Sequence, residues 1–254
     1  ILTIVFGSLG AKKMLLPKKT SWKHIFILCM FQTVIQYFFF YGGLAHTPGV
    51  KSSIIGATNV FAAILIAALI FRQEKLTFRK ILGCALGFSG VVLLNTLGAK
   101  GGAGLDASFH LNGEGFILLS TISYAFSSVF MKRFSKEDNP VMLSGWQFVF
   151  GGIIMAAAGA SFGGHMIIAD GKAAGAITLL TYMALISAAA YSIWGLLLKY
   201  NHVSRVVIFG FLNPVFGVIL SAIFLHEGGQ TGLITILSLA MVCAGIIVVS
   251  RGKK

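Results

Sequence analysis

Charged residues are scarce in this sequence of 254 residues, and so are cysteines. Charged side chains make up 11% of the chain, against about 25% in a typical soluble domain. The three cysteines each lie within an apolar run, which argues against a disulfide framework and against a zinc cluster. With 57% hydrophobic residues and a mean hydropathy of +0.90, the composition excludes soluble, disordered, collagen-like and disulfide-stapled secreted proteins. It predicts a membrane protein.

Motifs of catalysis are also missing from the sequence. It contains no P-loop, no His-Glu-x-x-His, no Gly-x-Ser-x-Gly and no dinucleotide-binding fingerprint. The six histidines are scattered and lie mostly near expected loops. We therefore predict that the protein is not an enzyme and that it uses no metal and no cofactor.

Eight apolar segments are long enough to cross a bilayer. A spanning helix needs about 20 mostly apolar residues, because the hydrocarbon core is about 30 Å thick and a helix rises about 1.5 Å per residue. The segments cover residues 22–44, 51–71, 79–98, 114–132, 140–163, 175–198, 205–225 and 230–250. The apolar stretch 1–10 precedes a basic cluster, the reverse of the order in a signal peptide, so we interpret it as the end of a helix that begins before residue 1.

The twenty lysines and arginines are concentrated in alternate loops. Seventeen lie before the first span, in every second loop after it, and in the C-terminal tail, whereas Lys51, Lys100 and Lys172 occupy the other loops singly. This alternation is typical of a multi-pass protein of the cell (inner or plasma) membrane, and it predicts a cytoplasmic C-terminus. A nucleic-acid-binding surface would have no reason to skip every second loop, so nucleic acid is not expected as a partner.

The second half of the chain repeats the first. A shift of 154 residues aligns Tyr37 with Tyr191 and Asn59 with Asn213, and the matches fall on the rarer polar and aromatic residues. Matching helices are separated by five spans, an odd number, so the two copies must be inverted in the membrane. Inverted repeats place a site near the midplane, where the halves meet, and this architecture is typical of transporters.

The ends of the two halves share further motifs. The first half contains Gly56-Ala57-Thr58-Asn59, Glu74-Lys75-Leu76-Thr77 and Gly90-Val91-Val92, and the second contains Phe211-Leu212-Asn213-Pro214, Phe224-Leu225-His226-Glu227 and Gly245-Ile246-Ile247. In these motifs the sequence resembles the drug/metabolite transporter superfamily, specifically its EamA type. It departs from the family pattern at Val60, which replaces a helix-breaking proline, and after Glu227, where Gly228 follows instead of leucine.

The resemblance implies an all-α polytopic membrane protein of two inverted five-helix repeats. The visible spans would be helices 3–10 of a ten-helix fold, with helix 1 and most of helix 2 missing. We expect a first repeat over residues 1–98, an outer Gly-rich linker over 99–113 and a second repeat over 114–250.

Polar side chains within the spans are the candidates for substrate binding, because such groups usually face the bundle interior or a cavity. The candidates are Gln32, Gln36, Tyr37, Asn59, Ser123, Tyr191, Trp194 and Asn213. Tyrosine and tryptophan can stack on a solute while making one hydrogen bond. Helix packing with interhelical hydrogen bonds is the alternative for the asparagines and for the serine-rich helix around Ser123, and the sequence leaves it open.

We therefore predict secondary-active or facilitative transport of a small organic solute, such as an amino acid or related metabolite, by alternating access. A broad-specificity multidrug exporter is the alternative, which the 22 phenylalanines permit. None of the seven acidic residues lies in the middle of a span, so we predict that these helices transport without proton coupling. The expected partners are the small-molecule substrate and the lipid bilayer. Gly83-x-x-x-Gly87 favours close helix contact, within the chain or in a homodimer.

Overall fold

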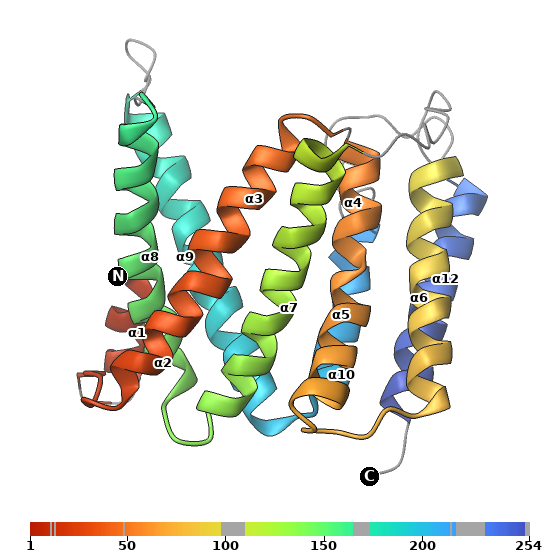
Figure 1. Cartoon of the computed structure of the whole chain (residues 1–254), viewed down its shortest axis with the longest axis horizontal. Helices are drawn as coiled ribbons and strands as arrows, with labels where there is room; N and C mark the ends of the chain where they lie inside the picture. Colours follow the sequence, from red (N-terminus) through yellow and green to blue (C-terminus); the bar gives the residue numbers. More distant parts are fainter. Residues whose placement is uncertain are drawn as a thin grey trace. The chain divides into compact units, whose positions relative to one another are not determined.

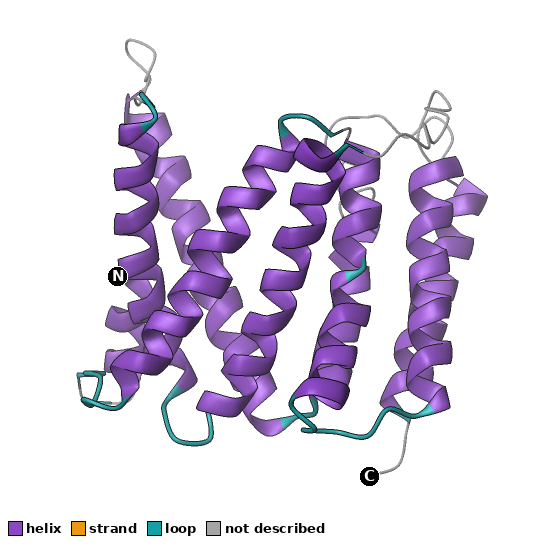
Figure 2. Ribbon diagram, viewed as in Figure 1, coloured by secondary structure: helices purple, strands orange, loops and turns teal. Residues whose placement is uncertain are grey.

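The part of the chain that the computed structural model describes consists of helices joined by loops. The model describes residues 1–10, 12, 14–47, 49–97, 110–164, 173–213, 215–216 and 232–251, and within these ranges it contains helices and loops but no strand (Figure 2). Four helical segments in this part of the chain are long and apolar enough to cross a membrane, namely Ser21–Leu44, Leu111–Phe134, Pro140–Ser161 and Ala173–Tyr200. These findings confirm the all-α class and agree with a polytopic membrane protein.

Most of the predicted spans coincide with helical segments. All except 205–225, which is described only to residue 216, agree with the helices to within three residues at either end. The predicted linker 99–113 lies largely outside the described residues. The agreement follows from the chemistry of the spans, since a run of about 20 apolar residues between polar loops is a local property of the sequence.

The helices form two compact units. Unit 1 consists of Ile1–Phe38 and Phe130–Tyr200, and unit 2 consists of Phe39–Val129 and Asn201–Lys254. Each unit thus combines segments of both predicted repeats. The repeat boundaries concern sequence similarity rather than contacts, and they stay a prediction.

Unit 1 is built around one long helix, α8 (Pro140–Ser161), which Asn139 caps by accepting a hydrogen bond from Val141 N at 2.9 Å. The helices that pack on α8 are α1 (Leu2–Gly10), α2 (Ser21–Leu28), the π-helical turn η1 (Cys29–Val34) and α9 (Ala173–Tyr200). A Cβ at Gly145 would lie 2.5 Å from Ile4 Cγ1. Glycine at this position is what allows α1 to approach α8 so closely. The chain continues from η1 into α3 (Ile35–Leu44).

Unit 2 contains the remaining helices, drawn in Figure 1. They are α4 (Gly49–Ala57), α5 (Asn59–Leu65), η2 (Ile66–Ile70), α6 (Phe78–Leu97), η3 (Leu111–Gly115), α7 (Phe116–Phe134), α10 (Val203–Val207), η4 (Ile208–Phe211) and α12 (Gly232–Ser250). Helix α7 begins in unit 2, and its last five residues, from Phe130 to Phe134, belong to unit 1.

Helices α6 and α12 lie side by side in unit 2 and run antiparallel (Figure 1). A Cβ at Gly83 would lie 2.8 Å from the carbonyl oxygen of Gly245, whereas one at Gly90, two turns further along α6, would lie 2.8 Å from that of Ser238, earlier in α12. The neighbouring Gly87 packs on the ring of Phe211. The Gly83-x-x-x-Gly87 face is therefore occupied within the chain, the first of the two alternatives left open by the sequence.

Candidate functional site

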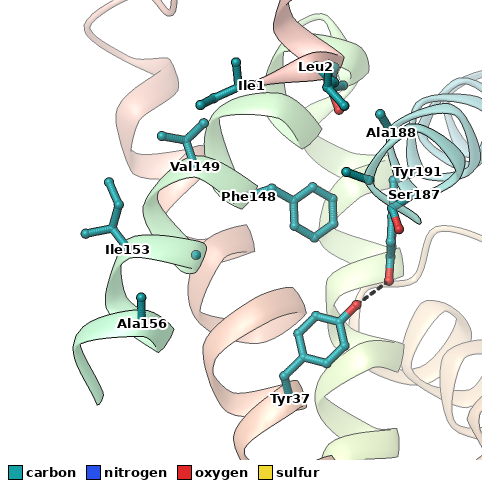
Figure 3. Close-up of a pocket in the computed structure, with 13 residues that line it drawn as sticks. Ile1, Leu2, Tyr37, Phe148, Val149, Ile153, Ala156, Ser187, Ala188 and Tyr191 are labelled. Carbon is teal, nitrogen blue, oxygen red and sulfur yellow. Dashed lines mark hydrogen bonds between the residues drawn. The ribbon is translucent and has the colours of Figure 1, made fainter. Parts of the chain in front are cut away.

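A cavity of about 620 Å³ lies within unit 1, a volume typical of sites for small organic molecules. Its walls come from α1, α3, α8 and α9 (Figure 3). Four of the thirteen lining residues carry a polar side chain, namely Thr3, Tyr37, Ser187 and Tyr191. The others are aliphatic or aromatic residues, alanines and a glycine, so the wall is mostly apolar.

Two tyrosines meet at this cavity. The phenol oxygens of Tyr37 and Tyr191 lie 3.0 Å apart and form a hydrogen bond (Figure 3). The ring of Phe148 meets the ring of Tyr191 edge-on, with 4.6 Å between the centroids and 63° between the planes. A phenol hydroxyl can donate and accept, so the pair combines an apolar aromatic wall with hydrogen-bonding oxygens.

Small residues on two facing helices leave room for the cavity. Gly152 and Ala156 are one helical turn apart on α8, and Ala184 and Ala188 are one turn apart on α9, and all four line the space. Residues four apart share a helix face. Neither this pattern nor Phe148 was predicted from the sequence. Small residues at a spacing of four on two spans would have indicated the cavity, but the same pattern also occurs at tight helix contacts.

A second polar cluster in unit 1 joins helices. Thr33 Oγ1 donates to Gln147 Oε1 at 3.0 Å, and Gln147 Nε2 donates to Gln32 Oε1 at 3.4 Å. All three residues are buried, Gln147 completely. Thr33 and Gln32 lie in the π-helical turn η1, and π-turns often occur at functional sites. Gln32 does not line the cavity. It links η1 to α8 through Gln147, and its role as a substrate ligand stays a prediction.

Two further candidates in unit 1 lie outside the cavity wall. Gln36 is half-buried, and its Oε1 is buried with no hydrogen-bond partner among the described residues. Trp194 follows Tyr191 by three residues on α9 and is also half-buried. Of the eight predicted residues, only Tyr37 and Tyr191 line this cavity.

The other three candidates belong to unit 2. Ser123 is buried within α7 at 4% exposure, and Asn213 is exposed. Asn59 is half-buried at the start of α5, and its Oδ1 is buried with no hydrogen-bond partner among the described residues. Their roles as substrate ligands stay predictions.

The helix before Asn59 is interrupted although the sequence has Val60 where the family pattern has proline. Helix α4 ends at Ala57 and α5 begins at Asn59. Between them the hydroxyl of Thr58 donates to the carbonyl oxygen of Ile55 at 2.6 Å, a bond that competes with the regular helix pattern. The repeat-related segment tightens into the 3₁₀ turn η4, while Pro214 lies outside the described residues.

A buried carboxylate holds two elements of unit 1 together at the start of α2. Asp138 Oδ1 accepts from Ser21 Oγ at 2.6 Å, and Asp138 Oδ2 lies 2.7 Å from His24 Nδ1. The Asp138 side chain is only 5% exposed. The His24 ring stacks on Phe134 with 4.0 Å between the centroids. These contacts fasten α2 to the end of α7 and the loop that follows it.

A second buried carboxylate, that of Glu74, lies in unit 2. Glu74 accepts from Ser204 N at 3.0 Å and from Ser204 Oγ at 2.7 Å, at the start of α10. Lys80 Nζ donates to Glu74 Oε2 at 2.9 Å, and the Glu74 side chain is 2% exposed. Glu74 thus binds the backbone and side chain of Ser204 at the start of α10. Its repeat-related partner Glu227 lies outside the described residues.

Comparison with known proteins identifies the family. The model of the EamA-like transporter family matches residues 1–96 and 111–251. The chain belongs to this family. The match confirms the resemblance seen in the sequence motifs, and the unmatched stretch between its two parts overlaps the predicted linker.

Those relatives of this chain whose names state a function are named as transporters. An uncharacterized transporter of Archaeoglobus fulgidus is 26% identical over 98% of this chain and 86% of its own length. Protein PecM of Dickeya dadantii is 26% identical over 95% of this chain and 80% of its own length. A solved crystal structure aligns with a TM-score of 0.77 and 18% identity over 98% of this chain and 84% of that chain, which shows a shared fold.

Family membership settles the broad class of the protein. It is a multi-pass membrane protein of a transporter family rather than an enzyme, and its activity is membrane transport of a small solute. The mostly apolar cavity in unit 1 is large enough for such a solute.

Proposed function

We propose that this chain transports a small organic solute, an amino acid or related metabolite, by alternating access, and that the cavity of unit 1 is part of the solute's path. The observation that carries the proposal is the Tyr37–Tyr191 hydrogen bond at the cavity wall. These two residues match under the 154-residue shift, and a pseudo-two-fold axis would bring such a pair together. Inverted-repeat transporters bind their solutes at that axis.

The packing of α6 on α12 supports the same arrangement. These helices close the two predicted repeats, and they contact one another antiparallel through Gly83 and Gly245. Antiparallel contact is what inverted copies require of helices that face each other across the axis. Small residues at the contact allow close backbone approach without interlocking side chains, which suits one half rocking against the other.

The predicted topology belongs to the proposal. We place the C-terminus and the basic loops in the cytoplasm, as the distribution of lysine and arginine indicates. Both carboxylate clusters, Asp138 with Ser21 and Glu74 with Ser204, join loops that this topology puts on the cytoplasmic side. Each cluster would then stabilise helix ends next to the cytoplasmic opening.

A broad-specificity multidrug exporter is the second candidate. The observation that favours it is the wall of the cavity, in which nine of thirteen residues carry no polar side-chain atom. An apolar wall with few directional groups discriminates weakly between hydrophobic compounds of similar size. A multidrug exporter would carry several unrelated cationic dyes, whereas a metabolite transporter would carry a narrow set of related solutes.

Uptake into proteoliposomes tests the proposal. The panel contains amino acids, nucleosides and cationic dyes, and each is measured with the wild-type chain, Gly152→Leu and Gly159→Leu. Both glycines are on α8 and a Cβ at either meets nothing within 4 Å, but only Gly152 lines the cavity. Gly152→Leu should lower the flux about tenfold or more, which corresponds to about 1.4 kcal/mol, while Gly159→Leu should not. Equal flux in both variants would remove the cavity from the transport path.

A further inference from the structure

We infer that the cavity of unit 1 selects solutes that carry no net or local charge and that present an aromatic or aliphatic body with one or two hydrogen-bonding groups. This inference rests on the proposed function, because it assigns a chemical class to the solute of the same site. Within the proposed range of metabolites, it favours neutral compounds over zwitterionic amino acids.

The cavity wall carries no charged side chain. Among the thirteen described residues that line it there is no aspartate, glutamate, lysine, arginine or histidine. The sequences of α1, η1, α3 and α8 contain none of these residues, and α9 contains only Lys199 in its last turn. Lys199 lies eight residues beyond Tyr191 on α9, a rise of about 12 Å along the helix.

A charged group would therefore find no side chain of opposite charge in the described wall of this space. Removing an ion from water is unfavourable unless an opposite charge and several hydrogen bonds replace the water, and this holds strongly at membrane depth. An amino acid brings an ammonium and a carboxylate, and each would need such partners. The described wall offers neither a cationic nor an anionic side chain to them.

The polar groups that do line the cavity suit neutral solutes. All four are hydroxyls, on Thr3, Tyr37, Ser187 and Tyr191. A hydroxyl can donate to a carbonyl and can accept from an amide or another hydroxyl. Hydroxyls thus match amide, hydroxyl and carbonyl groups, without the charge complementarity that carboxylates and ammonium groups require.

The aromatic rings favour a flat or apolar solute body. Phe148 and Tyr191 meet edge-on at 4.6 Å, and the Tyr37 phenol points towards Tyr191 (Figure 3). Aromatic side chains gain from stacked and edge-to-face contacts with a further ring. Gly152, Ala156 and Ala184 leave space beside these rings, so a planar group can lie against them.

A matched series of indole compounds tests the selection by charge. The series is indole-3-acetamide, which is neutral, indole-3-acetate, an anion, tryptamine, a cation, and tryptophan, a zwitterion. Binding of each to the purified chain in detergent is measured by calorimetry. The inference predicts that the neutral amide binds at least about tenfold more tightly than each charged member, a difference of about 1.4 kcal/mol. A charged member that binds as tightly as the amide, or an amide that does not bind, overturns the inference.

A variant designed to reverse the preference between the neutral amide and the cation gives a second measurement. Ser187→Asp places a carboxylate in the wall, whereas Ser161→Asp adds the same charge at the exposed end of α8, outside the cavity. With Ser187→Asp, tryptamine should bind more tightly than the amide, and with Ser161→Asp the wild-type order should persist. If a folded, monodisperse Ser187→Asp protein keeps the wild-type order, the inference is wrong; the wild-type series decides the question where this variant does not fold.

Flux measurements separate this inference from the proposed function. If tryptophan or tryptamine crosses the membrane and Gly152→Leu blocks its flux, the solute class is wrong and the transport path stands. If Gly152→Leu leaves the flux of every transported solute unchanged, the proposed path itself fails.

Discussion

Tyr37 Oη and Tyr191 Oη lie 3.0 Å apart at the wall of the unit 1 cavity, although 154 residues separate them in the sequence. The same two tyrosines coincide when the second half of the chain is shifted onto the first. Internal similarity singled out the pair, and tertiary structure brings its members into contact. The variants that follow test this pair, the packing around it and the topology of the chain.

Loss of the two phenol hydroxyls should not be additive. Tyr37→Phe and Tyr191→Phe each remove the hydrogen bond between these residues, so each should lower the free energy of unfolding by about 1 kcal/mol, and the double variant should lose less than the sum of the two single losses. Chemical denaturation in detergent measures the three values. Tyr182→Phe, at an exposed position on α9, is the control and should change stability by less than about 0.5 kcal/mol. Additive losses in the double variant would contradict the coupling.

Asp138→Asn should destabilise unit 1. The carboxylate accepts from Ser21 and lies 2.7 Å from His24, and an amide of the same shape keeps only part of this arrangement. We expect a loss of about 1.5–3 kcal/mol, the range for hydrogen bonds to a charged group. Glu137→Gln removes one charge at the adjacent exposed position and should have little effect. Thermal unfolding compares the two, and equal unfolding temperatures would show that the Asp138 contacts do not hold α2.

Two glycines on α8 should respond oppositely to alanine. A Cβ at Gly151 would lie 2.5 Å from Thr33 Cγ2, whereas one at Gly159 meets nothing within 4 Å. Gly151→Ala should cost about 1–3 kcal/mol through overpacking against η1, which outweighs the gain in helix propensity. Gly159→Ala should stabilise the helix by up to about 1 kcal/mol. Denaturation of both variants measures the difference, and a Gly151→Ala protein as stable as the wild type would mean that η1 does not approach α8 this closely.

Three histidine positions can be used to test the predicted membrane topology. His46 and His110 both lie next to Gly113. The carbonyl oxygen of His46 is close to Gly113, and the carbonyl oxygen of His110 accepts a hydrogen bond from Gly113 N at 3.1 Å. His202 lies near Glu74, beyond the other end of the α4–η2 helical run. In a Cys243→Ser background, cysteines at positions 46 and 110 should react with an impermeant maleimide from outside the cell, and a cysteine at 202 only after the membrane is opened.

The labelling experiment has a clear contrary result. The two native cysteines that remain in that background, Cys29 and Cys84, are buried and serve as the unreactive reference. If His46→Cys and His202→Cys were labelled from the same side, the run from α4 to η2 would not cross the membrane. The inverted arrangement of the repeats would then be wrong.

The sequence by itself determined the helical segments and the family. These properties are local or additive. Hydropathy over about 20 residues defines a span whatever surrounds it, and motifs such as Gly90-Val91-Val92 can be recognised without knowledge of tertiary contacts. The α4–α5 interruption is an instructive exception. Val60 gave no sign of it, and at the interruption the Thr58 hydroxyl donates to the carbonyl oxygen of Ile55.

Only the tertiary structure decided which polar and aromatic side chains share a space. Gln32 and Tyr37 both looked like wall residues, yet Gln32 bonds to Gln147 while Tyr37 reaches the cavity. Phe148 went unnoticed because a phenylalanine in an apolar helix can face lipid, a packed neighbour or a cavity with the same local pattern. Hydropathy is summed along one segment, whereas a cavity is the space that side chains from several helices leave between them, and it depends on contacts that no single segment encodes.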